Sequence, residues 1–359
     1  MAGKPESAIT ERNLASANAG PQDVLMNDQN DPSSLAYTNL QPEQMIAALE
    51  EIGYRCDGRF LALNSYENRV YQIGIEDSAP VVAKFYRPGR WSDAEILEEH
   101  DFAIELARTE LPVVAPSAHD GKTLLKSASF RFSVYPCRGG RAPELDDYDL
   151  LRQVGRLVAR IHLIGEVREF DVRPSIDIDS YGVASCNYLL DNEFIPIELD
   201  AAYESVTEQV LDEVEACQGR AGAVQQFRIH ADFHPGNVLI AGEQIHIVDL
   251  DDTRRGPAVQ DLWMFLSGDQ AEQAPQLEAL LEGYAEFRHF DARELHLIEA
   301  LRSLRIMHYA AWLARRWSDP AFKRAFPWFE GQRYWDEHIL SLREQVALMQ
   351  APPLQWQGR

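Results

Sequence analysis

Hydrophobic and polar positions follow two periods along the chain. The short period of strands occurs mainly in the first part, between two predicted helices, and the longer period of helices prevails later. A short amphipathic helix is predicted over residues 42–52. Apolar runs at 59–63 and 69–73 then flank a polar turn of five residues, which predicts a hairpin. A further apolar strand is predicted at 81–87, so the chain begins with a β-rich region.

The next predicted element is a helix over residues 91–108, because Ser92 can act as its N-cap in a capping box. Glu99 falls on the apolar stripe of this helix, where a carboxylate needs a partner. Lys84, which interrupts the preceding apolar strand, is the natural one. Glu98 replaces Glu99 in this role if the helix is rotated. An edge-strand lysine that faces solvent is the simpler interpretation of Lys84 alone.

A strand pair around residues 122–125 and 130–135 ends in a Pro-Cys-Arg-Gly-Gly-Arg segment at 136–141. A strand that ends in proline and a glycine pair is typical of a hinge. The segment at 166–200 shows no clear period and is predicted to be irregular. The remaining pattern is that of amphipathic helices, predicted at 146–165, 201–217, 272–288, 293–317 and 334–349.

These elements predict an α+β fold with two lobes, a small β-rich N-lobe and a larger, mostly helical C-lobe. We place the N-lobe at 37–136 and the C-lobe at 137–359. Residues 1–36 are rich in Ala, Asn, Ser, Asp and Pro without a sustained period, which predicts a disordered tail.

The most informative stretch is 228–252, in which two β-branched runs form a second predicted hairpin. Polar side chains stand at both ends of this hairpin. Asp232 precedes Asn237 by five positions, and Asp249 follows Asn237 by twelve. We therefore expect three oxygen-bearing side chains to converge at one point.

Oxygen ligands without cysteine suit a hard cation such as Mg²⁺. The spacing of Asp232 and Asn237 is that of a kinase catalytic loop, in which the aspartate accepts the proton of the acceptor hydroxyl and the asparagine helps to hold the metal. Asp249 stands where a second metal ligand is expected. With His234, the loop resembles that of aminoglycoside-phosphotransferase-like kinases, except that Ala231 replaces a glycine. We expect this replacement to be mild unless the backbone there needs a positive φ.

Two other interpretations of this stretch compete with the kinase site. One is an ordinary surface loop rich in aspartate. The other is a metallohydrolase site built on His230, Asp232 and His234, but the remaining histidines form no second ligand motif. Further along, a helix is predicted to start at 256–264. Its Asp261 is a candidate to brace the backbone of the catalytic loop, or is simply favoured by the helix dipole.

Charge and composition narrow the function classes. The 359 residues carry a formal net charge of -23, which opposes sequence-independent binding to nucleic acid or anionic membrane. There is no apolar run long enough to span a membrane and no apolar signal segment, so a cytoplasmic protein is expected. The four scattered cysteines fit free thiols in a reducing compartment.

The polar turn at 64–68 lies where a kinase covers the nucleotide phosphates, but it contains no glycine. Phosphate contacts would have to come from backbone N–H groups and from Ser65 or Asn68. A plain hairpin loop is the equal alternative.

Several longer words strengthen the kinase interpretation. They are LNSYENRVY at 63–71, VAKFYRP at 82–88, ILEEH at 96–100 and GPAVQDLWM at 256–264. From about residue 40 to residue 353 the chain resembles the stress response kinase A family of bacteria. These are eukaryotic-like serine/threonine protein kinases within the aminoglycoside phosphotransferase and homoserine kinase superfamily.

The resemblance implies roles for individual residues and for the protein. Asp232 would be the proton acceptor, Asn237 and Asp249 would hold Mg²⁺, and Ser65 would contact ATP. Lys84, held by Glu99, would bind the nucleotide phosphates. His234 would hydrogen-bond the γ-phosphate or Asp232, and Arg254 or Arg255 would add positive charge.

The expected activity is stress-related transfer of the ATP γ-phosphoryl group to a serine or threonine of a protein, by a monomer. A kinase of small alcohols such as choline, homoserine or an aminoglycoside has the same loop and stays the alternative. A nucleotide-binding scaffold without chemistry is disfavoured because all the expected polar groups are present.

Overall fold

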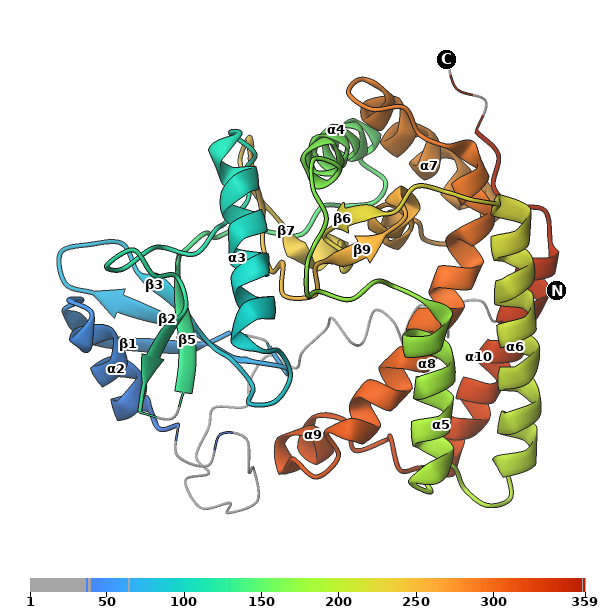
Figure 1. Ribbon diagram of the computed structural model, residues 1–359, viewed down its shortest axis with the longest axis horizontal. Helices are drawn as coiled ribbons and strands as arrows, with labels where there is room; N and C mark the ends of the chain where they lie inside the picture. Colours follow the sequence, from blue (N-terminus) through green and yellow to red (C-terminus); the bar gives the residue numbers. More distant parts are fainter. Residues whose placement is uncertain (1–36, 38–39, 64, 129, 357, 359) are drawn as a thin grey trace, which may run out of the picture.

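The computed structural model of the protein describes residues 37, 40–63, 65–128, 130–356 and 358. Its elements form a smaller sheet-containing lobe beside a larger helical one (Figure 1). The α+β, bilobal kinase-like fold predicted from the sequence is therefore confirmed. The predicted tail at 1–36 lies outside the described residues. Within the described part of the chain, no helix has both the length and the apolarity needed to cross a membrane.

The N-lobe is built on an antiparallel sheet with the strand order β1-β2-β3-β5-β4. Helices α2 and α3 flank the sheet, and the capping box predicted at Ser92 begins α3. The elements of this lobe are α2 (Pro42–Glu51), β1 (Cys56–Ala62), β2 (Arg69–Ile75), β3 (Val81–Phe85), α3 (Asp93–Arg108), β4 (Leu125–Ser127) and β5 (Phe130–Pro136).

Alternation along β3 decides which way its lysine points. Ala83 and Phe85 are buried in a core formed with Met45 and Leu49 of α2. Because neighbouring side chains in a strand point to opposite faces, Lys84 points away from that core. It pairs in the sheet with Val70 of β2 and with Ser133 of β5. The lysine therefore faces the side on which α3 and the second lobe lie.

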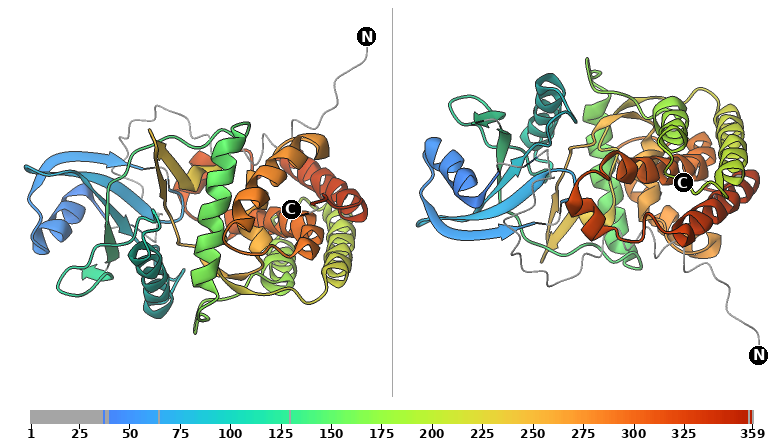
Figure 2. Two further views of the ribbon diagram at one scale, coloured as in Figure 1. Left: turned by 90° about the horizontal axis from the view of Figure 1, so that it is seen from above. Right: turned by 90° about the horizontal axis from the view of Figure 1, so that it is seen from below.

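The second lobe is mostly helical. In both views of Figure 2, α4 lies between the N-lobe sheet and helices α6 and α10. One core joins α4 and α7, and a second joins α5, α6, α8 and α10. The helices are α4 (Tyr148–Gly165), α5 (Ala184–Asp191), α6 (Asp200–Ala221), α7 (Gln270–Ala285), α8 (Ile298–Arg315), α9 (Pro320–Ala325) and α10 (Gln332–Gln350), with short helical turns η1 (Asp179–Val183), η2 (Pro235–Asn237), η3 (Ala258–Asp261), η4 (Trp263–Phe265) and η5 (Ala292–Leu297).

Short strands of this lobe carry the central stretch of the sequence. The predicted hairpin forms as β7 (Val238–Ala241) and β8 (Gln244–Ile247), and β6 (Phe227–Ile229) pairs with β9 (Arg254–Gly256). Ile247 of β8 bridges to Val113, and Ile240 of β7 bridges to Arg141, the last residue of the predicted hinge segment. These bridges hold both ends of the hairpin against the junction of the lobes.

Two local predictions were wrong, and one short helix was missed. The segment at 166–200 is not irregular throughout, because η1 and α5 occupy its second half, where the short apolar face of α5 packs against α8. The helix predicted at 256–264 is a pair of 3₁₀ turns, and the carboxylate of Glu294 takes up the N–H of Val259 there at 2.8 Å. Helix α9 was not predicted. In each case tertiary contacts decide what the local period leaves open.

Candidate active site

The catalytic-loop segment follows β6 and is braced from behind by Asp261. The two oxygens of this buried carboxylate accept hydrogen bonds from the N–H groups of His230 and Ala231, each at 2.8 Å. Oδ2, the oxygen bonded to His230, also lies 3.1 Å from Nε2 of buried His162 on α4. The predicted role of Asp261 as a brace of the loop backbone is therefore confirmed.

Ala231 adopts φ +70°, the left-handed region that favours glycine. Its substitution for glycine was expected to be mild on the condition that no positive φ is needed. That expectation was wrong, because the braced turn does require a positive φ. The two hydrogen bonds to Asp261 help to hold a conformation that an L-alanine avoids on its own.

Asp232 lies directly after this turn and is fixed on three sides. Its backbone oxygen accepts a hydrogen bond from Nδ2 of Asn237 at 2.9 Å, which closes the loop. Its carboxylate pairs with Arg305 of α8 at 2.6 Å and lies 3.6 Å from Nε2 of His234. Burial tends to raise the pKa of Asp232, but the charge of the Arg305 guanidinium opposes it and the pKa is lowered. The carboxylate is thus ionised at neutral pH, as a proton acceptor must be.

The tautomer of His234 follows from its contacts. Its Nδ1 accepts a hydrogen bond from the N–H of Gly236 at 3.0 Å. Burial lowers the pKa of His234, so the ring is neutral at pH 7. A neutral ring with Nδ1 as acceptor carries its proton on Nε2, which faces Asp232.

Lys84 is buried and makes two ion pairs across the junction of the lobes, with Asp249 at 3.1 Å and Asp251 at 2.8 Å. Burial tends to lower the pKa of Lys84, but the carboxylates outweigh it and hold the pKa well above its usual value. The ammonium is therefore charged.

The predicted ion pair between Lys84 and Glu99 is not among the ion pairs of the described residues. Glu99 instead lies 3.8 Å from Arg173, a residue of the connection between α4 and η1. The prediction was wrong because Asp249 and Asp251, which follow β8, occupy the ion-pair positions around the ammonium of Lys84. Burial raises the pKa of Glu99 to about 7, although Lys84 and Arg173 oppose the shift.

Sequence analysis missed the charged residues that surround Lys84. Asp251 also pairs with Arg90 and accepts a hydrogen bond from Asn68 at 3.2 Å, and Arg90 pairs with Asp252 at 2.7 Å. The cluster of aspartates at 249, 251 and 252 was an available signal, although strand alternation does not place them, because Asp249 adopts φ +61° and Asp251 lies in a turn. Arg90 and Arg305 carried no comparable signal, since each meets its partner only through the tertiary fold.

A cavity of about 310 Å³ lies beside this network. The predicted residues Ser65, Lys84, Glu99, Asn237 and Asp249 all line it, whereas Asp232 and His234 do not. Its other walls are mostly apolar and come from both lobes, with contributions from Leu63, Val70, Val82, Ala103, Val114, Tyr135, Pro136, Leu239, Val248 and Leu250. An apolar cavity whose polar end holds the Lys84 ammonium beside the oxygens of Asn237 and Asp249 is suited to a flat ring whose anionic tail brings a cation with it.

The remaining candidate residues, Ser65, Arg254 and Arg255, differ in whether they lie at the site. Ser65 lines the cavity, and its hydroxyl accepts a hydrogen bond from the N–H of Asn68 at 3.4 Å. Arg254 lies near the site, 3.6 Å from Asp252, whereas Arg255 pairs with Glu169 instead.

The metallohydrolase interpretation gains no support. His230 is buried, and its Nε2 lies 3.0 Å from the backbone oxygen of Val248. Among the described residues there is no group of three or more His, Cys, Asp and Glu side chains placed to hold a metal ion.

Comparisons with known proteins agree with this geometry. The model of the phosphotransferase enzyme family matches residues 59–298, which include the loop, the hairpin and the Lys84 strand. The chain belongs to this family. It is 45% identical over 323 residues to stress response kinase A of Escherichia coli K12, with 90% of this chain and 98% of the relative covered. It is 44% identical over 330 residues to the serine/threonine protein kinase RdoA of Salmonella typhimurium LT2, with 92% and 98% covered.

Solved structures support the fold. Amicoumacin kinase, determined in complex with AMP-PNP, Ca²⁺ and Ami, has a TM-score of 0.63 at 20% identity, and the match covers 81% of this chain and 93% of that one. Spectinomycin phosphotransferase, determined with ADP and spectinomycin, has a TM-score of 0.60 at 17% identity and covers 87% and 98%. The chain is thus a phosphotransferase of the kinase type, with the fold of these enzymes.

Proposed function

We propose that the protein is a serine/threonine protein kinase of the stress response, which transfers the γ-phosphoryl group of ATP to a hydroxyl with the help of Mg²⁺. The observation that carries the proposal is the pairing of Lys84 with Asp249 at the polar end of the cavity. Asp232 is joined through its backbone oxygen to Asn237, which lines the same cavity. The cavity thus leads a nucleotide toward a carboxylate that is ionised and exposed enough to meet an acceptor.

The donor set fits a hard cation. Asp249 keeps about half of its side chain exposed and lines the cavity together with Asn237. Because the amide nitrogen of Asn237 donates to Asp232, its amide oxygen is the atom left for a ligand. One carboxylate and one amide oxygen, completed by phosphate oxygens, are a usual protein contribution to Mg²⁺. When bound, Mg²⁺ would neutralise the charge on the phosphates.

The residues of the chain would then divide the remaining work. Lys84 would bind phosphate oxygens while Asp251 holds its ammonium at the cavity wall. Asp232 would accept the proton of the acceptor hydroxyl, and Arg305 keeps that carboxylate oriented and ionised. His234 would donate from Nε2 to Asp232 or to a phosphate oxygen. Since phosphoryl transfer needs little covalent help, positioning and charge neutralisation suffice.

The protein acceptor is supported by the relatives rather than by the cavity. The Salmonella relative is a serine/threonine protein kinase by name, and the match covers 98% of its length. A cytoplasmic location accords with that assignment. The second candidate is a small alcohol, because the solved structures with the same fold include kinases of amicoumacin and spectinomycin.

One labelling experiment tests both. The purified protein is incubated with Mg²⁺, γ-labelled ATP and either a protein mixture or a panel of aminoalcohols and aminoglycosides. We expect label on serine or threonine of protein, including the kinase itself, and none with Asp232→Ala. Label found only on a small molecule would replace the protein acceptor by the second candidate, and absence of any transfer would reject the proposal.

A further inference from the structure

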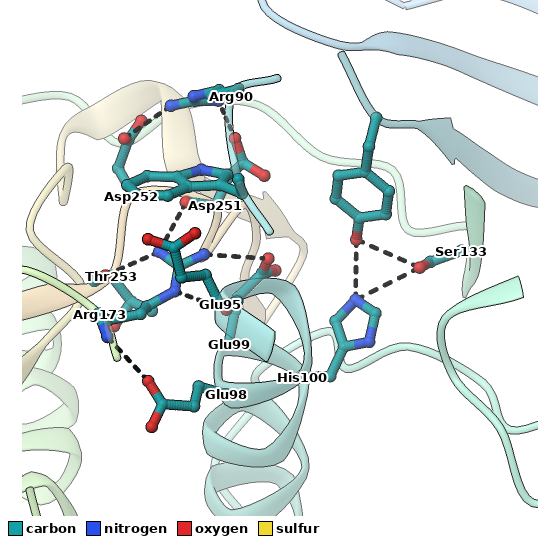
Figure 3. Close-up of polar contacts among 12 residues, drawn as sticks. Arg90, Glu95, Glu98, Glu99, His100, Ser133, Arg173, Asp251, Asp252 and Thr253 are labelled. Atoms are coloured by element: carbon teal, nitrogen blue, oxygen red, sulfur yellow. Dashed lines mark hydrogen bonds and ion pairs between the residues drawn. The ribbon is translucent and has the colours of Figure 1, made fainter. Parts of the chain in front are cut away.

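A buried arginine on the connection between α4 and η1 joins three parts of the site that are distant in sequence. Figure 3 shows Arg173 between helix α3 and the segment Asp251–Thr253. Its side chain has no exposed surface. A fully buried guanidinium is costly unless its donors are used, so its contacts show what holds it there.

The guanidinium binds backbone on two sides. Nε donates to the carbonyl oxygen of Glu95 in the first turn of α3 at 2.9 Å. One terminal nitrogen donates to the carbonyl oxygens of Asp251 at 2.9 Å and Thr253 at 2.8 Å. One side chain therefore ties the N-lobe helix to the segment that directly follows Asp249.

The other terminal nitrogen has no hydrogen bond and lies 3.8 Å from Oε2 of Glu99, an oxygen that also has none. Since Lys84 pairs with Asp249 and Asp251, Arg173 supplies the ion pair of Glu99. The ring of Trp91 covers the guanidinium, with its centroid 4.5 Å from the guanidinium carbon. Water is thereby kept from the contact.

The backbone of the connection is held as well. The carboxylate of Glu98 accepts hydrogen bonds from the N–H groups of Asp171, Val172 and Arg173, at 2.5, 3.1 and 2.9 Å. Glu98 and Glu99 are consecutive on α3. The carboxylate of Glu98 binds the backbone of the connection, and that of Glu99 faces the guanidinium of Arg173. Both the backbone and the side chain of Arg173 are therefore held in place.

We propose that Arg173 is a positioning residue of the phosphotransfer site, which sets the place of the metal ligand Asp249 relative to α3 by holding the backbone of residues 251–253. The inference rests on the proposed function for its effect on catalysis. Arg173 does not line the cavity. It acts through the segment that it binds, as outer partners of metal ligands do.

Arginine is required here by geometry. The planar guanidinium presents donors in three directions, and this site uses two of them on backbone oxygens and turns the third toward a carboxylate. A lysine ammonium keeps the charge for Glu99 but cannot span the distance between the α3 carbonyl and the two loop carbonyls. Charge and positioning are therefore separable by substitution.

The test compares Arg173→Met and Arg173→Lys with Arg168→Met. Arg168 is on the same connection, is 55% exposed and pairs with Glu105 of α3 at 3.3 Å, so it matches the change without touching the site. We expect Arg173→Met to raise the Mg²⁺ concentration for half-maximal activity by about tenfold and to lower kcat by a similar factor, with the acceptor KM unchanged. Arg173→Lys should fall between, and Arg168→Met should equal the unmodified protein.

A second readout does not depend on activity. Hydrogen exchange of the amides at 249–253 should be at least about tenfold faster in Arg173→Lys than in Arg168→Met, because a local opening then costs less. Unchanged exchange together with an unchanged Mg²⁺ requirement in Arg173→Lys, which retains the charge and so the fold, would overturn the inference. If the unmodified protein transfers no phosphate, the proposed function fails. Faster hydrogen exchange at 249–253 in Arg173→Lys would still show that Arg173 holds this segment in place.

Discussion

The two ends of the candidate site are built differently. At the nucleotide end, Lys84 and Asp251 are almost entirely buried and Arg90 is 13% exposed, and both cations pair with Asp251 across the lobes, while Asp249 at the cavity is about half exposed. At the acceptor end, the side chains of Asp232 and Arg305 remain 25% and 34% exposed. A buried set of charges holds one geometry, because any change leaves a partner unpaired in a low dielectric. The exposed pair can adapt to what approaches it.

This contrast suggests which end fixes the chemistry and which end selects the acceptor. Residues of the nucleotide end come from β3, the segment after β3 and the segment after β8. Arg305 comes from α8, in the helical part of the C-lobe. A change in those helices would alter the acceptor without disturbing the nucleotide.

The largest effects on kcat are expected from replacing Asp249 and Asp232, and nucleotide binding should distinguish the nucleotide end from the acceptor end. Asp249→Ala and Asp232→Ala should each lower kcat by about 10³-fold, since one removes the proposed metal ligand and the other the proposed proton acceptor. Only Asp249→Ala should weaken Mg²⁺-dependent binding of AMP-PNP, as measured by calorimetry. A similar loss of AMP-PNP binding in Asp232→Ala would show that the two ends are not separate.

Smaller effects on the kinetic constants are expected when the cationic side chain of either end is replaced, Lys84 at the nucleotide end or Arg305 at the acceptor end. Lys84→Met should lower kcat/KM for ATP by about 100-fold, because the phosphates lose their buried partner. Arg305→Met should lower kcat by about tenfold and raise the acceptor KM, while the KM for ATP is unchanged. Steady-state kinetics with each substrate varied in turn distinguish these patterns. An effect of Arg305→Met on the KM for ATP alone would contradict the division.

The sequence predicted more of the nucleotide end than of the acceptor end, for a physical reason. Lys84, Asn237 and Asp249 lie in short sequence motifs, in which the predicted strands and turns set the direction of each side chain. In the structure all three line the same cavity. Ion pairs are harder to predict, because a partner is chosen by distance after folding. Glu99 was therefore assigned to Lys84, although Arg173 is its partner. Arg305 was missed because nothing local marks one arginine of a long helix.

A pH effect tests the charge balance of the nucleotide end. Burial raises the pKa of Glu99 to about 7, above its ordinary value of 4.5. A raised carboxyl contributes stability that is fully present below pH 4.5 and is lost as pH rises through 7. Relative to Glu99→Gln, the free energy of unfolding of the unmodified protein should thus fall by about 2 kcal/mol between pH 5 and pH 8.

Urea unfolding of both proteins at several pH values measures this difference. Glu98→Gln is the matched control, because Glu98 precedes Glu99 on α3 and its carboxylate accepts backbone hydrogen bonds outside the Lys84 cluster. A difference between Glu99→Gln and the unmodified protein that stays constant from pH 5 to pH 8 would mean that Glu99 remains charged throughout. Arg173 would then compensate it more strongly than the geometry indicates.

The smallest effect concerns the backbone of the acceptor end. Ala231 is held at φ +70° and Asp249 at φ +61°, so each end contains one residue in the left-handed region. Aspartate tolerates this region better than alanine. Ala231→Gly should therefore raise the free energy of unfolding by about 0.5–1 kcal/mol, the relief of strain being partly offset by the greater freedom of glycine in the unfolded chain.

Because the hydrogen bonds from residues 230 and 231 to Asp261 are made by backbone N–H groups, Ala231→Gly retains them. We therefore expect kcat to stay within about twofold of its original value, while urea unfolding shows the added stability. Ala83→Gly is a control, since Ala83 lies in the middle of β3, where glycine should destabilise. Destabilisation by Ala231→Gly would show that the loop has adapted to alanine and that its positive φ carries little strain.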